Sequence, residues 1–128
     1  MPPELPRPTD AELEILTVLW STGPATVRQV YENISRRRIA QYSTVLKFMQ
    51  IMADKGLLLR DEEQRAHVYR ASRPREWTQR QLAGDLLQRA FSGSARSLLL
   101  GALSARKVSR EELAELKKFL EEYEEGTR

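Results

Sequence analysis

The sequence predicts a mainly α-helical protein with one small β-hairpin. Over residues 9–55, apolar residues recur with helical spacing, and pairs of capping residues mark where helices begin. After Gly56 the pattern changes to two short strand-like runs around an acidic turn. Helical spacing returns over residues 76–128. The predicted order is therefore three helices, a hairpin and a helical tail.

Size and composition are those of one folded domain with a short appendage. The chain has 128 residues, of which 41% are hydrophobic and 30% are charged. It has no cysteine, which excludes disulfides and thiolate sites. No apolar window approaches the roughly 18–20 residues of a membrane span, so no membrane insertion is expected. Residues 1–8 contain four prolines and no apolar run, which predicts a flexible lead-in, no signal peptide and a cytoplasmic protein.

The formal net charge of +3 is unevenly distributed along the chain. Residues 1–35 carry a net charge of −3, residues 36–75 carry +6, and residues 76–128 are balanced. A positive central segment would attract a polyanion such as DNA through phosphate contacts and counterion release. The alternative is that a run such as Arg36-Arg37-Arg38 is only a solvated surface.

Two capping boxes predict where the first two helices begin. Thr9 and Glu12 have the spacing of a capping box, in which each side chain bonds to the other's backbone amide. Gly23-Pro24 ends the first helix. Thr26 and Gln29 repeat the same spacing and predict the start of a second helix.

A third helix is predicted over residues 41–55, with Gly56 as the residue that can turn left-handed after its end. At about 100° per residue, one face of this helix is apolar and should pack on the first two helices. That face consists of Val45, Phe48, Met49 and Met52.

Residues 57–60 and 66–70 are strand-like runs that flank the acidic turn 61–64, which predicts a β-hairpin. Three helices followed by a hairpin is the order of a winged helix-turn-helix, whose hairpin lies beside the DNA backbone. Residues 9–75 are therefore expected to form a winged-helix DNA-binding domain.

The face of the third helix opposite its core carries hydroxyls, a lysine and an amide, which suit contacts to phosphates and base edges. Leu46 and Ile51 lie at its margins and are expected to be exposed, which favours contact with thymine methyl groups or the wing. Arg65 and His67 of the hairpin could reach phosphates, with the acidic turn pointing away. The alternative is an ordinary amphipathic helix with polar residues in water. The candidate DNA-binding residues are Tyr42, Ser43, Thr44, Leu46, Lys47, Gln50, Arg65 and His67.

The tail, residues 76–128, has three helical stretches, and a segment of this length is too short to bury a core independently. Gly93 should separate the first two, and Ser109 with Glu112 has capping-box spacing. We therefore expect two tails to bury their apolar stripes in a homodimer; the alternative is a tail folded back on its own winged helix. The expected dimerisation residues are Leu86, Phe91, Leu98, Leu99, Leu113, Leu116 and Leu120.

Over nearly its whole length, the chain closely resembles the penicillinase-repressor family of bacterial transcriptional regulators, the BlaI/MecI/CopY type. Each matching segment is short, but their order and spacing together are specific. The segments are 13–20, 23–26, 43–45, 55–57, 65–69, 91–94, 98–100 and 109–113 followed by Leu116.

The resemblance implies a homodimeric repressor of a palindromic operator, read mainly by Ser43, Thr44 and Lys47. It also implies derepression by proteolysis in the tail, after a membrane sensor metalloprotease detects a cell-wall antibiotic. Ser94 and Ala95 occupy the positions where well-known members have a scissile Asn–Phe bond. Leu46 and Ile51 stand where members often carry Lys and Arg. The C-terminal cysteines of the copper-responsive branch are absent.

No motif supports catalysis or a cofactor. His67 is the only histidine, and there is no phosphate-binding glycine loop, nucleophile elbow or paired-carboxylate constellation. We therefore expect neither an enzyme nor a metal protein. Two other functions stay open, namely a regulator whose effector binds between the dimer tails and a protein-interaction module that uses Leu46 and Ile51.

Overall fold

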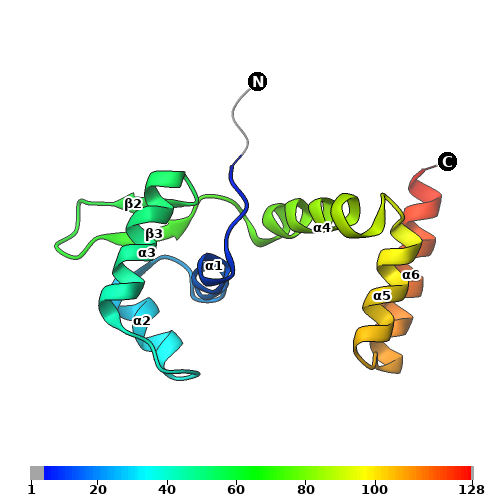
Figure 1. Cartoon of the computed structure of the whole chain (residues 1–128), viewed down its shortest axis with the longest axis horizontal. Coiled ribbons are helices and arrows are strands. Elements are labelled where there is room, and N and C mark those ends of the chain that lie inside the picture. The colour runs from blue at the N-terminus through cyan, green and yellow to red at the C-terminus, as the bar shows by residue number, and fades with distance from the viewer. Residues whose placement is uncertain (1–4, 128) are drawn as a thin grey trace. The chain divides into compact units, whose positions relative to one another are not determined.

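The computed structural model of the chain describes residues 5–127 (Figure 1). Its contacts divide the chain into two compact units, Met1–Ala83 and Gly84–Arg128. The described elements follow the predicted order of three helices, a hairpin and three tail helices. Among residues 5–127, no helix combines the length and the apolar character needed to cross a membrane.

Helix α1 spans Asp10–Thr22, and its start confirms the predicted capping box. The Glu12 amide donates to Thr9 Oγ1 at 3.2 Å, and the Thr9 amide donates to Glu12 Oε1 at 2.9 Å. Gly23 ends the helix with a φ of +84°, which a residue with a Cβ rarely adopts.

Helix α2 spans Val27–Ser35 and begins at the second capping box, Thr26 with Gln29, as predicted. Helix α3 spans Tyr42–Lys55 and is followed by Gly56 in the left-handed conformation, with a φ of +86°. The expected end of α3 is therefore confirmed. Its start differs from those of α1 and α2, because its N-cap residue, Gln41, makes no side-chain capping hydrogen bond.

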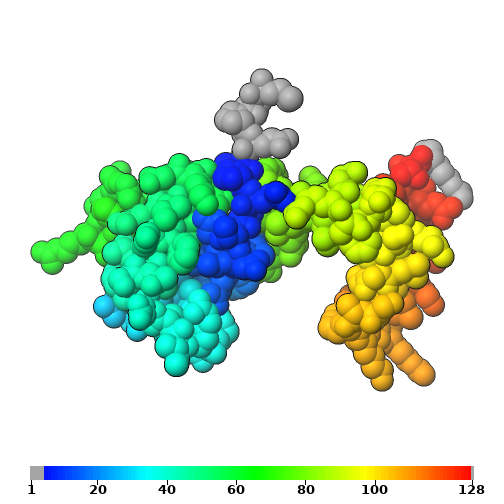
Figure 2. Space-filling view, viewed as in Figure 1, coloured from blue at the N-terminus to red at the C-terminus, as the bar shows by residue number. Residues whose placement is uncertain are grey.

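The sheet has three antiparallel strands in the order β1-β3-β2. Strands β2 (Leu58–Asp61) and β3 (Val68–Ala71) form the predicted hairpin, with Arg60 opposite Tyr69. The hairpin, residues 58–71, is the wing, and it extends from the first unit as a narrow arm (Figure 2). Strand β1 (Ala25–Thr26) pairs with β3 and was not predicted, because two residues are too few to show a periodicity.

The core lies between α1, α2, α3 and the sheet. Val45, Met49 and Met52 of α3 are buried as predicted, while Phe48 is half-buried against the core. The expectation that Leu46 and Ile51 are exposed was wrong, since both are half-buried. Leu46 packs against the core and also lines the groove between α3 and the wing.

Residues that precede α1 and follow β3 are tied to this core. Leu5 packs against it, and its carbonyl oxygen accepts a hydrogen bond from Gln81 Nε2 at 2.8 Å. The indole Nε1 of Trp20 donates to the carbonyl of Arg73 at 3.0 Å, just before α4 (Arg75–Phe91) begins. The first turns of α4 therefore belong to the first unit, and Thr78 is buried there.

In the second unit, α4 ends at Phe91, and α5 spans Ala95–Ala105. Gly93, with a φ of +80°, confirms the predicted break, and its amide donates to the carbonyl of Leu87 at 2.9 Å. Helix α6 spans Arg110–Gly126.

Only half of the predicted capping box of α6 forms. Ser109 Oγ accepts from the Glu112 amide at 3.1 Å. The Glu112 carboxylate does not return to Ser109, because it pairs with Arg106 at 3.3 Å.

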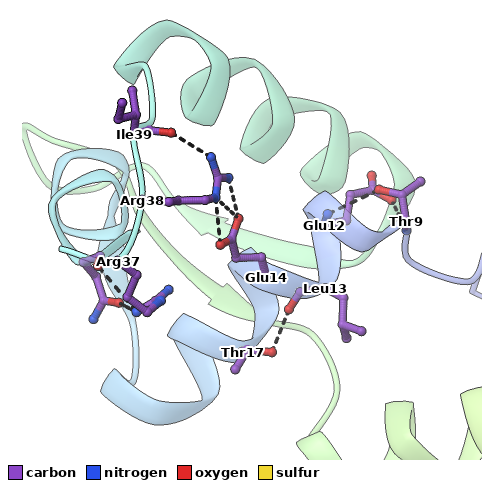
Figure 3. A network of polar contacts seen from close by, with 9 residues as sticks. Thr9, Glu12, Leu13, Glu14, Thr17, Arg37, Arg38 and Ile39 are labelled. Atoms are coloured by element: carbon purple, nitrogen blue, oxygen red, sulfur yellow. Dashed lines mark hydrogen bonds and ion pairs between the residues drawn. The ribbon is translucent and has the colours of Figure 1, made fainter. Parts of the chain in front are cut away.

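Glu12 also joins α1 to the end of α3. Its carboxylate is almost fully buried and accepts from Lys55 Nζ at 2.9 Å (Figure 3 shows its bond to Thr9). Burial by itself raises the pKa of Glu12, but the Thr9 amide and Lys55 lower it more, so the net pKa lies below its ordinary value of 4.5.

We predict that Glu12→Gln lowers the free energy of unfolding by about 1–2 kcal/mol at neutral pH, because Lys55 loses a charged partner. A lowered pKa stabilises the fold at pH values above 4.5, and this contribution is lost as the pH falls through the lowered pKa. The difference between the two proteins should therefore shrink under acid. Urea denaturation at a fixed protein concentration measures it, with the exposed Glu76→Gln as control. A difference that stays constant with pH would contradict the assignment.

Candidate nucleic-acid interface

A groove runs between α3 and the wing. Its volume is about 430 Å³, and the residues that line it include Tyr69, which is 2% exposed. Helices α2 and α3 and the turn of the wing all contribute to its walls. We call it the wing groove, and it is lined by Thr26, Val27, Arg28, Tyr42, Leu46, Gln50, Arg65, Ala66, His67 and Tyr69.

The wing groove brings together residues from both ends of the predicted site. It contains Tyr42, Leu46 and Gln50 of α3 together with Arg65 and His67 of the wing turn. The three helical residues are spaced four apart in sequence, so they follow one side of α3. The sequence spacing is enough to place Tyr42, Leu46 and Gln50 in one row on α3. Only the fold places the wing turn next to this row.

The other three predicted residues of α3, Ser43, Thr44 and Lys47, are exposed but do not line the wing groove. Thr44 instead lines a separate cleft beside α1 and the turn between α2 and α3. The exposed surface of α3 therefore presents the hydroxyl, ammonium and amide groups that base-edge contacts use.

Arg28 is a residue of the wing groove that sequence reasoning missed. Its guanidinium lies 5.0 Å from the centre of the Tyr42 ring, a cation–π geometry. The Tyr31 ring meets the same Tyr42 ring edge-on, with 5.7 Å between centres. Arg28 stands in the first turn of α2, two residues after the Thr26 cap, and this place at the start of a predicted helix is the sequence signal that could have identified it.

The electrostatics of the wing groove favour an anion. Arg28, Arg65 and His67 line it, and no carboxylate is among its lining residues. Two carboxylates at the wing turn have other partners: Glu62 pairs with Arg60 at 2.6 Å, and Asp61 Oδ1 accepts from the Glu63 amide at 2.9 Å. A phosphate in the wing groove would meet the guanidinium groups of Arg28 and Arg65, with no carboxylate among the lining residues.

The start of α3 adds to this bias. Its first turn contains no acidic residue, and its N-cap makes no side-chain hydrogen bond. The first amides of an α-helix lack intrahelical partners, and the helix dipole places partial positive charge there. Among residues 5–127, there is no group of three or more metal-ligating side chains. At this surface the first amides of α3 and the guanidinium groups of Arg28 and Arg65 lie beside exposed polar side chains of α3.

Comparison with known proteins agrees with this geometry. The profile of the penicillinase repressor family matches residues 8–122. The transcriptional regulator BlaI of Mycobacterium tuberculosis is 36% identical over 124 residues, which cover 96% of this chain and 89% of that protein. The penicillinase repressor of Bacillus licheniformis is 27% identical over 120 residues, which cover 94% of each chain.

Solved structures resemble the winged helix. The solution structure of the DNA-binding domain of the repressor BlaI superposes with a TM-score of 0.51 at 25% identity, covering 56% of this chain and 88% of that one. The Bacillus licheniformis BlaI monomer in complex with the blaP half-operator gives a TM-score of 0.50 at 25% identity, covering 57% and 89%. The predicted winged-helix fold is thereby confirmed.

The family profile and the 36% identical relative both span most of the chain, and members of the family are transcriptional repressors, not enzymes. The chain belongs to the penicillinase repressor family of transcriptional regulators.

Proposed function

We propose that this protein is a cytoplasmic homodimeric repressor that reads a palindromic operator with α3. The observation that carries the proposal is the wing groove, where Arg28 and Arg65 stand beside the exposed polar surface of α3. Phosphate contacts would come from the wing groove and the start of α3, and base contacts from Ser43, Thr44 and Lys47. A relative in this family was solved on a half-operator, which supports the same role here.

Leu46 and Gln50 lie on α3 and also line the wing groove, so either could contact a base edge there. Gln50 is exposed and carries an amide that can bond to an adenine edge. Leu46 is half-buried, so only part of its side chain could meet a thymine methyl group. Its packing against the core also weakens the alternative of a protein-interaction module, which needs a larger apolar surface at this position.

The second unit supports a homodimer. Helices α5 and α6 contain no buried residue, and Leu86, Leu99, Leu113 and Leu120 are between 39% and 51% exposed. Phe91, Leu98 and Leu116 are half-buried. Such a row of leucines is stabilised when a second copy covers it, and closed two-fold dimers are the commonest way to do so. Two reading heads related by a two-fold axis require a palindromic site.

Regulation by proteolysis fits the connection between α4 and α5. Ser94 is the N-cap of α5, in an extended conformation, and Ser94 Oγ accepts from the Ser97 amide at 3.1 Å. Cleavage between Ser94 and Ala95 would separate α5 and α6 from the winged helix, and so remove most of the dimerisation stripe. The proposed protease is the membrane sensor metalloprotease that the family resemblance implies.

Operator binding is tested with the purified protein and its own upstream DNA, by mobility shift across a salt series with unrelated DNA as competitor. We expect Lys47→Ala to weaken operator binding by about tenfold, because a base-edge contact is lost. We expect Arg28→Ala to weaken binding to both DNAs similarly and to reduce the log–log salt slope by about one.

The control for both variants is Lys107→Ala, which removes the same charge from an exposed position between α5 and α6. Full operator affinity in Lys47→Ala would exclude its role in reading. Weak binding of the wild-type protein without preference for its upstream DNA would favour the protein-interaction alternative.

Dimerisation is tested by Leu120→Lys, which places a charge in the apolar stripe of α6. We expect sedimentation equilibrium to find a dimer for the wild type and a monomer for the variant, with weaker operator binding. The matched control is Ala114→Lys, which adds the same charge about 120° around α6 from Leu120, at about 100° per residue. A wild-type monomer would support the tail folded back on its own winged helix.

Cleavage is tested by Ala95→Pro. Ala95 is the first residue of α5, where proline is well accepted, and the extended Ser94 can precede a proline. Most proteases do not cut before proline, so we expect a stable repressor that is no longer cleaved during induction, and an operator that stays repressed. Immunoblots with a winged-helix antibody measure this. Normal induction of the variant without a shortened fragment would favour an effector ligand as the signal.

A further inference from the structure

The turn that leads into α3 is held to the rest of the fold by few apolar contacts. This turn, residues 36–41, joins α2 to α3. Ile39 at its centre is 95% exposed. A cleft of about 280 Å³ opens between the turn, α1 and α3, and Ile34, Ile39 and Thr44 are among the residues that line it. Helix α3 also begins without a side-chain cap, so the turn before it gains no capping hydrogen bond from Gln41.

An ion pair with α1 holds the turn instead (Figure 3). Arg38 Nε lies 3.2 Å and 3.1 Å from the two carboxylate oxygens of Glu14, and a second guanidinium nitrogen also bonds to Glu14. The third nitrogen donates to the carbonyl oxygen of Ile39 at 3.0 Å. One guanidinium therefore joins α1 to the backbone of the turn. Such multidentate arginine–carboxylate contacts are the most orientation-specific kind of ion pair.

The neighbouring Arg37 has a different hydrogen-bond partner. Arg37 donates to Asn33 Oδ1 at 2.6 Å and so stays within α2 and its end. Arg38 is thus the residue of the triple-arginine run that reaches α1. The hydrogen bond from Arg38 lowers the pKa of Glu14 below its ordinary value, as expected for a carboxylate held by a guanidinium.

The opposite end of α3 is held by the same helix. Lys55, the last residue of α3, donates to the buried Glu12 carboxylate at 2.9 Å. Glu12 and Glu14 lie two residues apart on α1, so α1 contacts both the end of α3 and the turn before its start.

We propose that Glu14 is a positioning residue for DNA reading, which acts by holding Arg38 and thereby fixing the first turn of α3. This inference rests on the proposed DNA-binding function. Ser43 and Thr44 belong to that first turn, so their placement against base edges depends on the turn. Base-edge hydrogen bonds tolerate little displacement, whereas phosphate attraction is long-range and non-specific.

Loss of the pair should therefore affect the two kinds of DNA differently. Without Glu14, Arg38 becomes available to phosphates, so affinity for unrelated DNA should stay constant or rise. Affinity for the operator should fall. The ratio of operator affinity to unrelated-DNA affinity is the readout that a loss of folded protein alone would not move.

The experiment uses the full chain and compares Glu14→Gln, Arg38→Gln and the charge-swapped double variant Glu14→Arg with Arg38→Glu. The matched control is Glu76→Gln, which makes the same chemical change at an exposed position of α4. We expect each single variant to lower the affinity ratio about threefold or more, the size expected of a half-exposed ion pair. The double variant should recover part of the ratio, and the control should match the wild type.

Amide hydrogen exchange of residues 39–45 provides a second readout that needs no DNA. We expect faster exchange there in Glu14→Gln than in the control, with similar melting temperatures. Wild-type exchange rates and an unchanged affinity ratio in Glu14→Gln would overturn the proposal. If the wild type itself shows no operator preference, the proposed function fails, while the exchange rates still decide whether Glu14 holds the turn.

Discussion

Burial of one face of α3 is the constraint on which the rest of the winged helix depends. Met49 and Met52 are fully buried between α1, α2 and the sheet. Because a helix is a rigid cylinder, burying this face decides which of its other residues meet solvent. The exposed polar surface of α3, and the side that meets the wing, are both consequences of the same packing.

Acidic and basic side chains lie on different sides of α3: the acidic ones on α1, and the basic ones in the wing groove. The acidic α1 holds the helix, since Glu12 pairs with Lys55 and Glu14 pairs with Arg38. The wing groove is lined by Arg28, Arg65 and His67 without a carboxylate. The negative N-terminal segment and the positive central segment are therefore partners in the fold, while Arg28 and Arg65 line the wing groove outside these two pairs.

The two units show opposite balances of burial. The winged helix encloses its own core, whereas α5 and α6 keep a row of half-exposed leucines and the stacked rings of Phe119 and Tyr123. An apolar surface of this kind raises the free energy of an isolated chain in water. The unit that contains the wing groove thus encloses its own core, whereas the second unit leaves apolar side chains exposed.

The sequence by itself determined the features that depend on residues close to one another in the sequence. The capping boxes at Thr9 and Thr26, the left-handed Gly56, the hairpin and the apolar face of α3 were all predictable for this reason, and so was the fold class. The family resemblance added the expectation that Ser43, Thr44 and Lys47 read the operator. Only the tertiary structure decided contacts between distant segments, because periodicity carries no information about them. Strand β1 forms by pairing with β3, Arg28 meets Tyr42 across two helices, and Lys55 reaches Glu12 over 43 residues. Leu46 is half-buried for the same reason, since it packs against a core that several distant segments build.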